Sequence, residues 1–262
     1  MALPFGLDVS RWDGLLNYDQ LAKYSETVEP VIFMAYRATI SWGYKDPFFV
    51  ANFKGAGKQY LRMAYHVVYP AENAQRQVDN LMEQINLAGF DPAHDRLILD
   101  AELDHGASRT AITKSIYDHA AMIQGKVGRL PILYARTEWL NRLTYPQNLT
   151  HLDLHLAQYL NRAPLAKYAK EHPGPPHPLP TGHTKWLIHQ TSDKTPNICA
   201  GPLDGKVKDF QDYNRWNGTA MNVYQYFGYS GQPEPEPEPP APQTVEERLK
   251  NLEARVSKLE NK

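Results

Sequence analysis

The sequence predicts an α/β protein whose main domain, residues 1–229, is a closed but irregular β/α barrel. Seven short runs rich in apolar, β-branched and aromatic residues recur along it, and helix-like stretches separate the earlier ones. Strands that alternate with helices form a mainly parallel sheet, and seven or eight strands in a domain of this length favour a closed barrel. The helical pattern fades after about residue 160, so we expect the last third of the barrel to be irregular.

The expected strands share a composition typical of buried β-structure. They are FGLDVS (5–10), VIFMAYRAT (31–39), RMAYHVVY (62–69), RLILDAEL (96–103), LPILYAR (130–136), LHLAQY (154–159) and KWLIHQTS (185–192). Helices are expected over 46–59, 73–89 and 108–128, and Ser108 is suited to cap the third of them.

The C-terminal tail has a different character. Proline alternates with glutamate in residues 230–243, which predicts an extended linker of the polyproline type. Residues 244–262 follow with a heptad pattern of apolar residues at Val245, Leu249, Leu252, Val256 and Leu259. This pattern favours a coiled-coil helix through which the chain forms a homo-oligomer. The alternative is a single amphipathic helix that docks on the main domain.

Composition excludes several classes of protein. The 28 basic and 29 acidic residues nearly balance, so we expect no nucleic-acid partner. The only cysteine is Cys199, so no disulfide can form within the chain. The sequence has no apolar run of 18 residues, so we expect no membrane insertion, and the N-terminus lacks the features of a signal peptide. The histidines show no metal-binding spacing, so we expect neither a metal nor another cofactor.

Polar side chains gather where the expected strands end, and the active site of a β/α barrel lies at that end. The pattern is clearest at Asp100 and Glu102, which flank one alanine in RLILDAEL. Alternate residues of a strand point to the same face, about 6.5–7 Å apart. Two carboxylates at that separation raise one another's pKa, which leaves a protonated acid beside a charged one. Glycosidic bond cleavage requires such a pair. The alternative is that both carboxylates lie in a solvated loop or pair with basic side chains.

Taken in order, several stretches resemble the family 25 glycoside hydrolases, the Chalaropsis-type lysozymes or N-acetylmuramidases. The resemblance covers about residues 5–220. It rests on GLDVSRWDG, MAYRAT, AYHVVYPAENAQRQVDNLM, LILDAEL, LPILYARTEWLNRL, LHLAQY and DYNRWNGT. It implies a barrel of five βα units with three further strands. It also implies hydrolysis of the β-1,4 bond between N-acetylmuramic acid and N-acetylglucosamine in bacterial peptidoglycan.

The resemblance also implies roles for individual residues. Glu102 matches the general acid, and Asp100 matches its partner, which either stabilises the transition state or orients an attacking N-acetyl group of the substrate. Substrate-binding roles are implied or expected for five further residues near the strand ends: Asp8, Asp212, Tyr65, Tyr134 and Gln158. Two histidines depart from the family pattern, because His155 and His189 occupy positions where the family has aromatic residues.

Two other functions stay open at this point: a wall-binding module without turnover, including a virion-associated one, and a glycosidase for another amino-sugar polymer. Among cell-wall hydrolases, the lack of a signal peptide is typical of phage endolysins. We therefore expect the chain to stay in the host cytoplasm until lysis releases it onto the cell wall.

Overall fold

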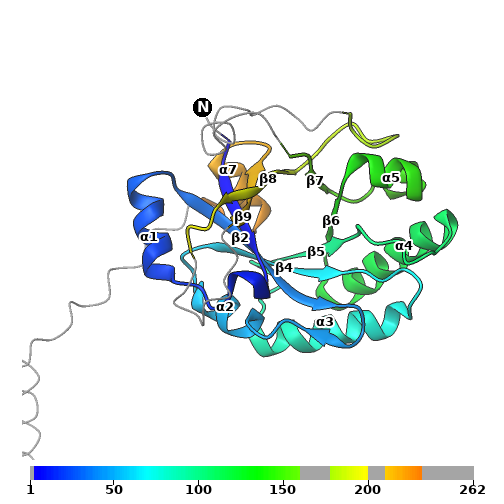
Figure 1. Ribbon diagram of the computed structural model, residues 1–262, viewed down its shortest axis with the longest axis horizontal. Helices are drawn as coiled ribbons and strands as arrows, with labels where there is room; N and C mark the ends of the chain where they lie inside the picture. The colour runs from blue at the N-terminus through cyan, green and yellow to red at the C-terminus, as the bar shows by residue number, and fades with distance from the viewer. Residues whose placement is uncertain (1–2, 160–177, 200–209, 232–262) are drawn as a thin grey trace, which may run out of the picture. The chain divides into compact units, whose positions relative to one another are not determined.

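The computed structural model describes residues 3–159, 178–199 and 210–231, and it confirms the barrel (Figure 1). The elements of its first part, in chain order, are β1 (Phe5–Val9), η1 (Arg11–Asp13), α1 (Tyr18–Thr27), β2 (Val31–Ile40), β3 (Tyr44–Lys45), α2 (Phe49–Gly55), β4 (Leu61–Val67), α3 (Ala74–Ala88) and β5 (Arg96–Asp100). Those of its second part are α4 (Arg109–Val127), β6 (Ile132–Ala135), α5 (Thr137–Leu143), η2 (Pro146–Leu149), β7 (Leu154–Ala157), β8 (Ile188–Pro196), β9 (Phe210–Trp216) and α7 (Ala220–Tyr226).

Eight strands close on one another, and the short β3 adds to the edge of β2. The order along the sheet is β1-β9-β8-β7-β6-β5-β4-β2-β3, and a further pairing of β1 with β2 closes the barrel. Neighbours from β1 through β2 and β4 to β8 run parallel, whereas β9 pairs antiparallel with both β8 and β1. Five βα units therefore precede three further strands in the described residues, as the sequence predicted.

Each expected strand overlaps an observed strand, but one boundary matters for function. The run 96–103 was expected to be a strand throughout, and this is wrong beyond Asp100, where β5 ends. The β9 strand falls outside the seven apolar runs. The helices follow their capping residues: Ser108 accepts a hydrogen bond from the Ala111 N–H at 3.3 Å, so α4 begins there.

Side chains that alternate along the strands make two apolar layers. On β2, Met34 and Tyr36 pack toward the surrounding helices, whereas Phe33 and Ala35 fill the barrel interior. The interior is so tight at Gly6 that a Cβ atom there would lie 2.3 Å from the Phe33 ring. A side chain at this position would therefore displace the core of the barrel.

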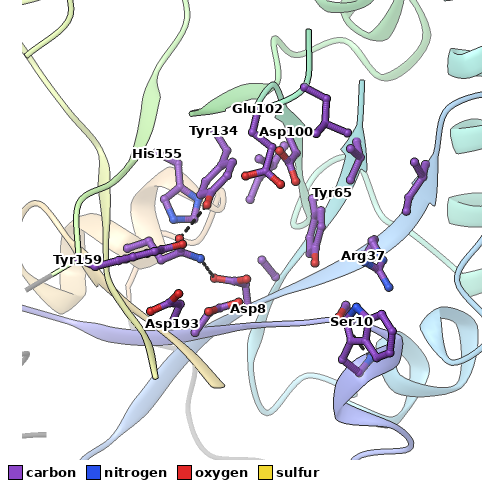
Figure 2. Close-up of a pocket in the computed structure, with 18 of the residues that line it drawn as sticks. Asp8, Ser10, Arg37, Tyr65, Asp100, Glu102, Tyr134, His155, Tyr159 and Asp193 are labelled. Carbon is purple, nitrogen blue, oxygen red and sulfur yellow. Dashed lines mark hydrogen bonds between the residues drawn. The ribbon is translucent and has the colours of Figure 1, made fainter. Parts of the chain in front are cut away.

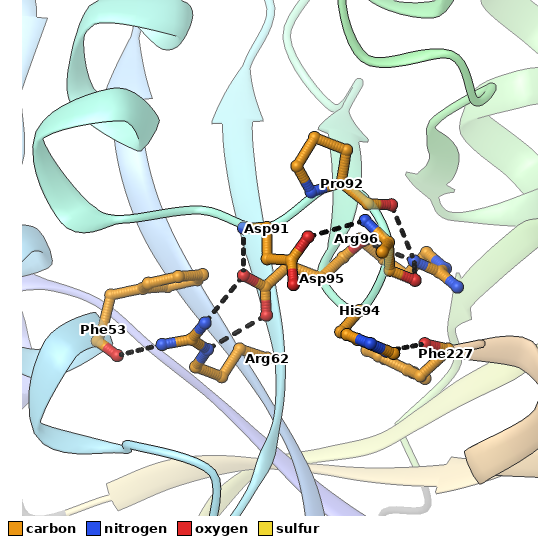
Figure 3. A network of polar contacts seen from close by, with 9 residues as sticks. Phe53, Arg62, Asp91, Pro92, His94, Asp95, Arg96 and Phe227 are labelled. Atoms are coloured by element: carbon orange, nitrogen blue, oxygen red, sulfur yellow. Dashed lines mark hydrogen bonds and ion pairs between the residues drawn. The ribbon is translucent and has the colours of Figure 1, made fainter. Parts of the chain in front are cut away.

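The end of the barrel opposite the cleft is closed by α7 and by a polar network (Figure 3). Arg96 donates from its guanidinium to the carbonyl oxygens of Tyr226, Ala93 and Asp95, and so ties the C-terminal end of α7 to the loop before β5. Arg62 and Asp95 pair at 2.8 Å beside it. These contacts hold Val223 of α7, and Phe227 just after the helix, against the interior core.

The predicted linker and coiled coil at 230–243 and 244–262 lie almost wholly outside the described residues and stay predictions. Within the described part of the chain, no helix is both long and apolar enough to cross a lipid bilayer.

Candidate active site

A cavity of about 340 Å³ opens at the C-terminal ends of the strands (Figure 2). Six of the seven predicted site residues line it: Asp8, Tyr65, Asp100, Glu102, Tyr134 and Asp212. Gln158 is not among the lining residues of the described chain, and its neighbour Tyr159 is. The closed barrel brings the strand ends to one rim, and so brings together side chains as distant in the sequence as Asp8 and Asp212.

Asp100 and Glu102 occupy the same wall but differ in their backbone setting. Alternation along β5 places Ile98 in the barrel interior and Asp100 just above it, 7% exposed. The last ladder contact runs from the Ala101 N–H to the Tyr134 carbonyl at 2.9 Å, and Glu102 then lies on the following loop, exposed at the rim. The pair shares a cavity because the chain turns above β5, and strand alternation alone does not account for its placement.

Both carboxyls have raised pKa values. Burial is the largest cause for Asp100, whose pKa lies well above the ordinary value; the charges of Glu102 and Asp8 raise it further, and Arg37 opposes them. Its Oδ1 atom has no hydrogen-bond partner. Loss of hydration in the cleft also raises the pKa of the Glu102 carboxyl, while Arg136 lowers it. A pair of this kind holds a proton at a pH where an ordinary carboxyl has lost it.

Asp8 stands opposite this pair in a hydrogen-bonded network whose directions are fixed. Its Oδ2 atom accepts from Gln190 Nε2 at 2.9 Å and from Asn214 Nδ2 at 2.8 Å. Because Gln190 donates with its nitrogen, its Oε1 is the acceptor for the Tyr134 hydroxyl at 2.8 Å. Asn214 likewise presents its Oδ1 to His155 Nε2 at 2.7 Å. Residues of four other strands thus hold the Asp8 carboxylate: Gln190 of β8 and Asn214 of β9 bond it directly, and Tyr134 of β6 and His155 of β7 bond those two in turn.

His155 must be the tautomer that carries its proton on Nε2, since the Asn214 oxygen can only accept. The ring is 2% exposed and packs edge-on against Tyr134, with centroids 5.0 Å apart. Burial is the main reason that the pKa of His155 falls to about 4. At neutral pH the ring is therefore an uncharged donor in the network.

A second anchored wall is built around Asp46, which is 4% exposed. Its Oδ2 atom accepts from Arg37 Nε at 2.9 Å and from the Arg11 backbone N–H at 2.8 Å. The first contact places Arg37 beside its register partner Tyr65, and the second fixes the short helix η1 that carries Trp12. Arg37, Tyr65 and Trp12 all line the cavity.

Several lining residues were missed by sequence reasoning. The cavity also includes Ser10, Trp12, Arg37, Tyr69, His155, Tyr159 and Asp193. Asp193 lies on β8 three residues beyond Gln190 and adds a fifth carboxylate. Its sequence signal was present, because Asp193 follows the HQTS stretch at another strand end.

Two other chemistries find no site in the described chain. No group of three or more histidine, cysteine or acidic residues there is arranged to hold a metal ion. Cys199 is buried and accepts from Gln211 Nε2, and burial raises the pKa of its thiol to about 12. A thiol in this environment is a poor nucleophile.

Comparison with known proteins identifies the family. The model of the glycosyl hydrolases family 25 matches residues 7–197. The uncharacterized protein YegX of Escherichia coli K12 is 27% identical over 225 residues, which are 84% of this chain and 72% of that protein. Lysozyme M1 of Streptomyces globisporus is 26% identical over 229 residues, 83% of this chain and 69% of that protein.

Solved structures share the fold. The bacterial lysozyme from Streptomyces coelicolor superposes with a TM-score of 0.69 at 23% identity, over 87% of this chain and 98% of that one. The muramidase from Acremonium alcalophilum gives a TM-score of 0.67 at 22% identity, over 86% and 99% of the two chains. The family model spans most of the chain, including the strands that carry Asp8, Asp100 and Tyr134, and the chain therefore belongs to glycosyl hydrolase family 25 and is a glycoside hydrolase.

Proposed function

We propose that the chain is a peptidoglycan muramidase that hydrolyses the β-1,4 bond between N-acetylmuramic acid and N-acetylglucosamine. The observation that carries the proposal is the pair Asp100 and Glu102, two carboxyls with raised pKa values in one cleft of a family 25 barrel. The names of the relatives, a lysozyme and a muramidase, support this choice of substrate.

Glu102 is the proposed general acid. It lies at the open rim, where a leaving-group oxygen can reach it, and its raised pKa keeps a proton available. Asp100 is deeper and more buried, and in its charged form it either stabilises the oxocarbenium-like transition state or orients the substrate N-acetyl group that attacks in its place. In both versions the two carboxyls carry opposite protonation states during the reaction.

The other lining residues are proposed to bind and orient the sugar chain. Asp8 and Asp212 are direct register partners on β1 and β9, and they face the cavity together with Tyr65 and Tyr134. Gln158 is assigned a supporting role, because its backbone N–H donates to the Gln190 carbonyl and its own carbonyl accepts from His189. These contacts shape the wall behind the cleft.

Product analysis on purified peptidoglycan tests the proposal. Wild-type protein should release fragments that end in reducing N-acetylmuramic acid, whereas reducing N-acetylglucosamine would mean glucosaminidase activity and would contradict the assignment. Glu102→Gln should fold normally and lose at least a hundredfold in kcat, as expected for a general acid. The matched control is Glu83→Gln, an exposed glutamate on α3 paired with Lys45, which should keep full activity.

We further propose that the chain acts as an endolysin and assembles through residues 244–262. The heptad pattern supports oligomerisation, and linked catalytic domains would raise the local concentration at the wall. Deletion of residues 230–262 should give a monomer with weaker wall binding by sedimentation and pull-down. Unchanged sedimentation would contradict the coiled coil, and cleavage products would be unaffected in either case.

A further inference from the structure

An aromatic pair at the cleft rim has no role in the chemistry described so far. Tyr69 lines the cavity just after β4, and His105 lies on the loop that follows Glu102. The two rings are in close contact, with centroids 3.9 Å apart and planes inclined by 35°. His105 is exposed on its other sides, so this contact is not part of the barrel core.

The backbone of each partner is held in place. Gln77, buried on α3, accepts from the Tyr69 N–H and donates to the Tyr69 carbonyl, both at 2.9 Å. His105 has a φ of 46°, a left-handed conformation that only Ser41 shares among the described residues other than glycine. Such a conformation is unfavourable for histidine, whereas Gly106 beside it tolerates a positive φ without cost.

The pair stands next to the proposed acid. Val67 and Asp100 are register partners on β4 and β5. Tyr69 lies two residues after Val67, and Glu102 lies two residues after Asp100. Tyr69 and Glu102 therefore occupy neighbouring positions on the same rim of the cavity. A general acid lies beside the oxygen of the departing sugar, so that sugar must pass over this part of the rim.

We propose that Tyr69, supported by His105, is the platform on which the sugar ring on the leaving-group side of the scissile bond stacks. The proposal rests on the function proposed above. A pyranose ring presents an apolar C–H face, and its burial against a rigid aromatic ring is favourable. His105 acts as a positioning residue: its strained backbone is maintained because it presses the imidazole against the tyrosine.

Steady-state kinetics on soluble glycan strands test the platform. Tyr69→Leu should raise KM about tenfold, as expected for the loss of one aromatic contact, whereas Tyr69→Phe keeps the ring and should stay near wild type. His105→Gly should leave Tm nearly unchanged, because the relieved strain offsets the lost ring contact and the greater freedom of glycine in the unfolded chain, and yet should raise KM severalfold. The control Tyr117→Ala removes an exposed tyrosine whose ring contacts His151 on the outer surface, far from the cleft lining, and KM should not change.

A double variant separates a supporting role from an independent one. If His105 acts through Tyr69, His105→Gly should leave KM unchanged in a Tyr69→Leu background. Equal KM values for wild type, His105→Gly and Tyr69→Leu would overturn the platform, and a full additional effect in the double variant would overturn the supporting role of His105. These KM comparisons require that the wild-type enzyme cleaves the glycan strands. Failure of the muramidase assignment would instead appear in the wild-type products.

Discussion

Replacement of Asn214 by leucine tests whether the Asp8 network is as important as its geometry suggests. Asn214 is 1% exposed and joins Asp8 to His155 through bonds of 2.8 and 2.7 Å. Leucine has a similar size but can neither donate nor accept, so the Nε2–H of His155 would lose its acceptor in a buried site.

The expected cost follows from these contacts. A hydrogen bond to a charged group contributes roughly 1.5–3 kcal/mol, and a buried donor left without a partner costs about 1–3 kcal/mol. Because the two terms overlap, we expect Asn214→Leu to lose about 2–4 kcal/mol of unfolding free energy, or roughly 5–15 °C in Tm for a domain of this size. The loss in kcat/KM should exceed what the lower unfolding free energy alone would cause, since Asp8 loses one of the two donors that orient it.

Urea denaturation and kcat/KM measurements provide the assay. The matched control is Asn217→Leu, an exposed asparagine just beyond β9 whose side-chain amide donates to the Trp186 carbonyl, and its effect should stay below about 1 kcal/mol. Adding His155→Phe to Asn214→Leu should recover part of the loss, because both partners are then apolar. A change below about 0.5 kcal/mol in Asn214→Leu, the size expected for a surface site, would refute the importance of the network, as would strict additivity in the double variant.

Three further variants test the carboxyl pair and the closed end of the barrel. Asp100→Asn should abolish activity and raise the stability of the folded protein at neutral pH. Because the folded pKa of Asp100 is raised, the wild-type protein loses stability as pH rises from the unfolded to the folded pKa of this carboxyl, whereas an amide does not titrate. An unchanged pH profile of Tm would contradict this expectation. The alkaline limb of kcat/KM should report the raised pKa of Glu102, and Arg136→Gln should move that limb to higher pH, because the arginine lowers this pKa. Arg96→Met should lower Tm by several degrees through loss of its carbonyl contacts at the end of α7, with KM unchanged at the distant cleft.

The sequence predicts the barrel well because its strands are buried on both faces and therefore read as apolar runs. It predicts β9 poorly, since that strand turns Asp212 and Asn214 toward the cavity and lacks an apolar run. The end of β5 was misplaced because Ala101 and Leu103 continue the alternating pattern of the strand, although pairing with β4 and β6 ends at Asp100. The chain turns at His105 and Gly106, where a positive φ at histidine is not visible in composition.

The candidate site shows the same division. Acidic residues at strand ends could be found one by one, and the strand-end rule then brought them together. The partners of Asp8 could not be found in this way, because His155 and Asn214 lie 59 residues apart and meet only when the barrel closes. A histidine at a position that the family fills with an aromatic residue signals a local change, but its bonding partner depends on the three-dimensional structure.

Closure of the barrel and assembly of the cleft are therefore one event. Strand β9 supplies Asp212 and Asn214, and it pairs antiparallel with both β8 and β1. Clustered carboxylates repel one another and oppose closure, whereas the hydrogen bonds of Gln190 and Asn214 to Asp8 offset part of that cost across the same seam. Local opening of β9 would remove the network and the cleft wall together, so hydrogen exchange in β9 should rise in any variant that weakens the network, before the remaining strands lose protection.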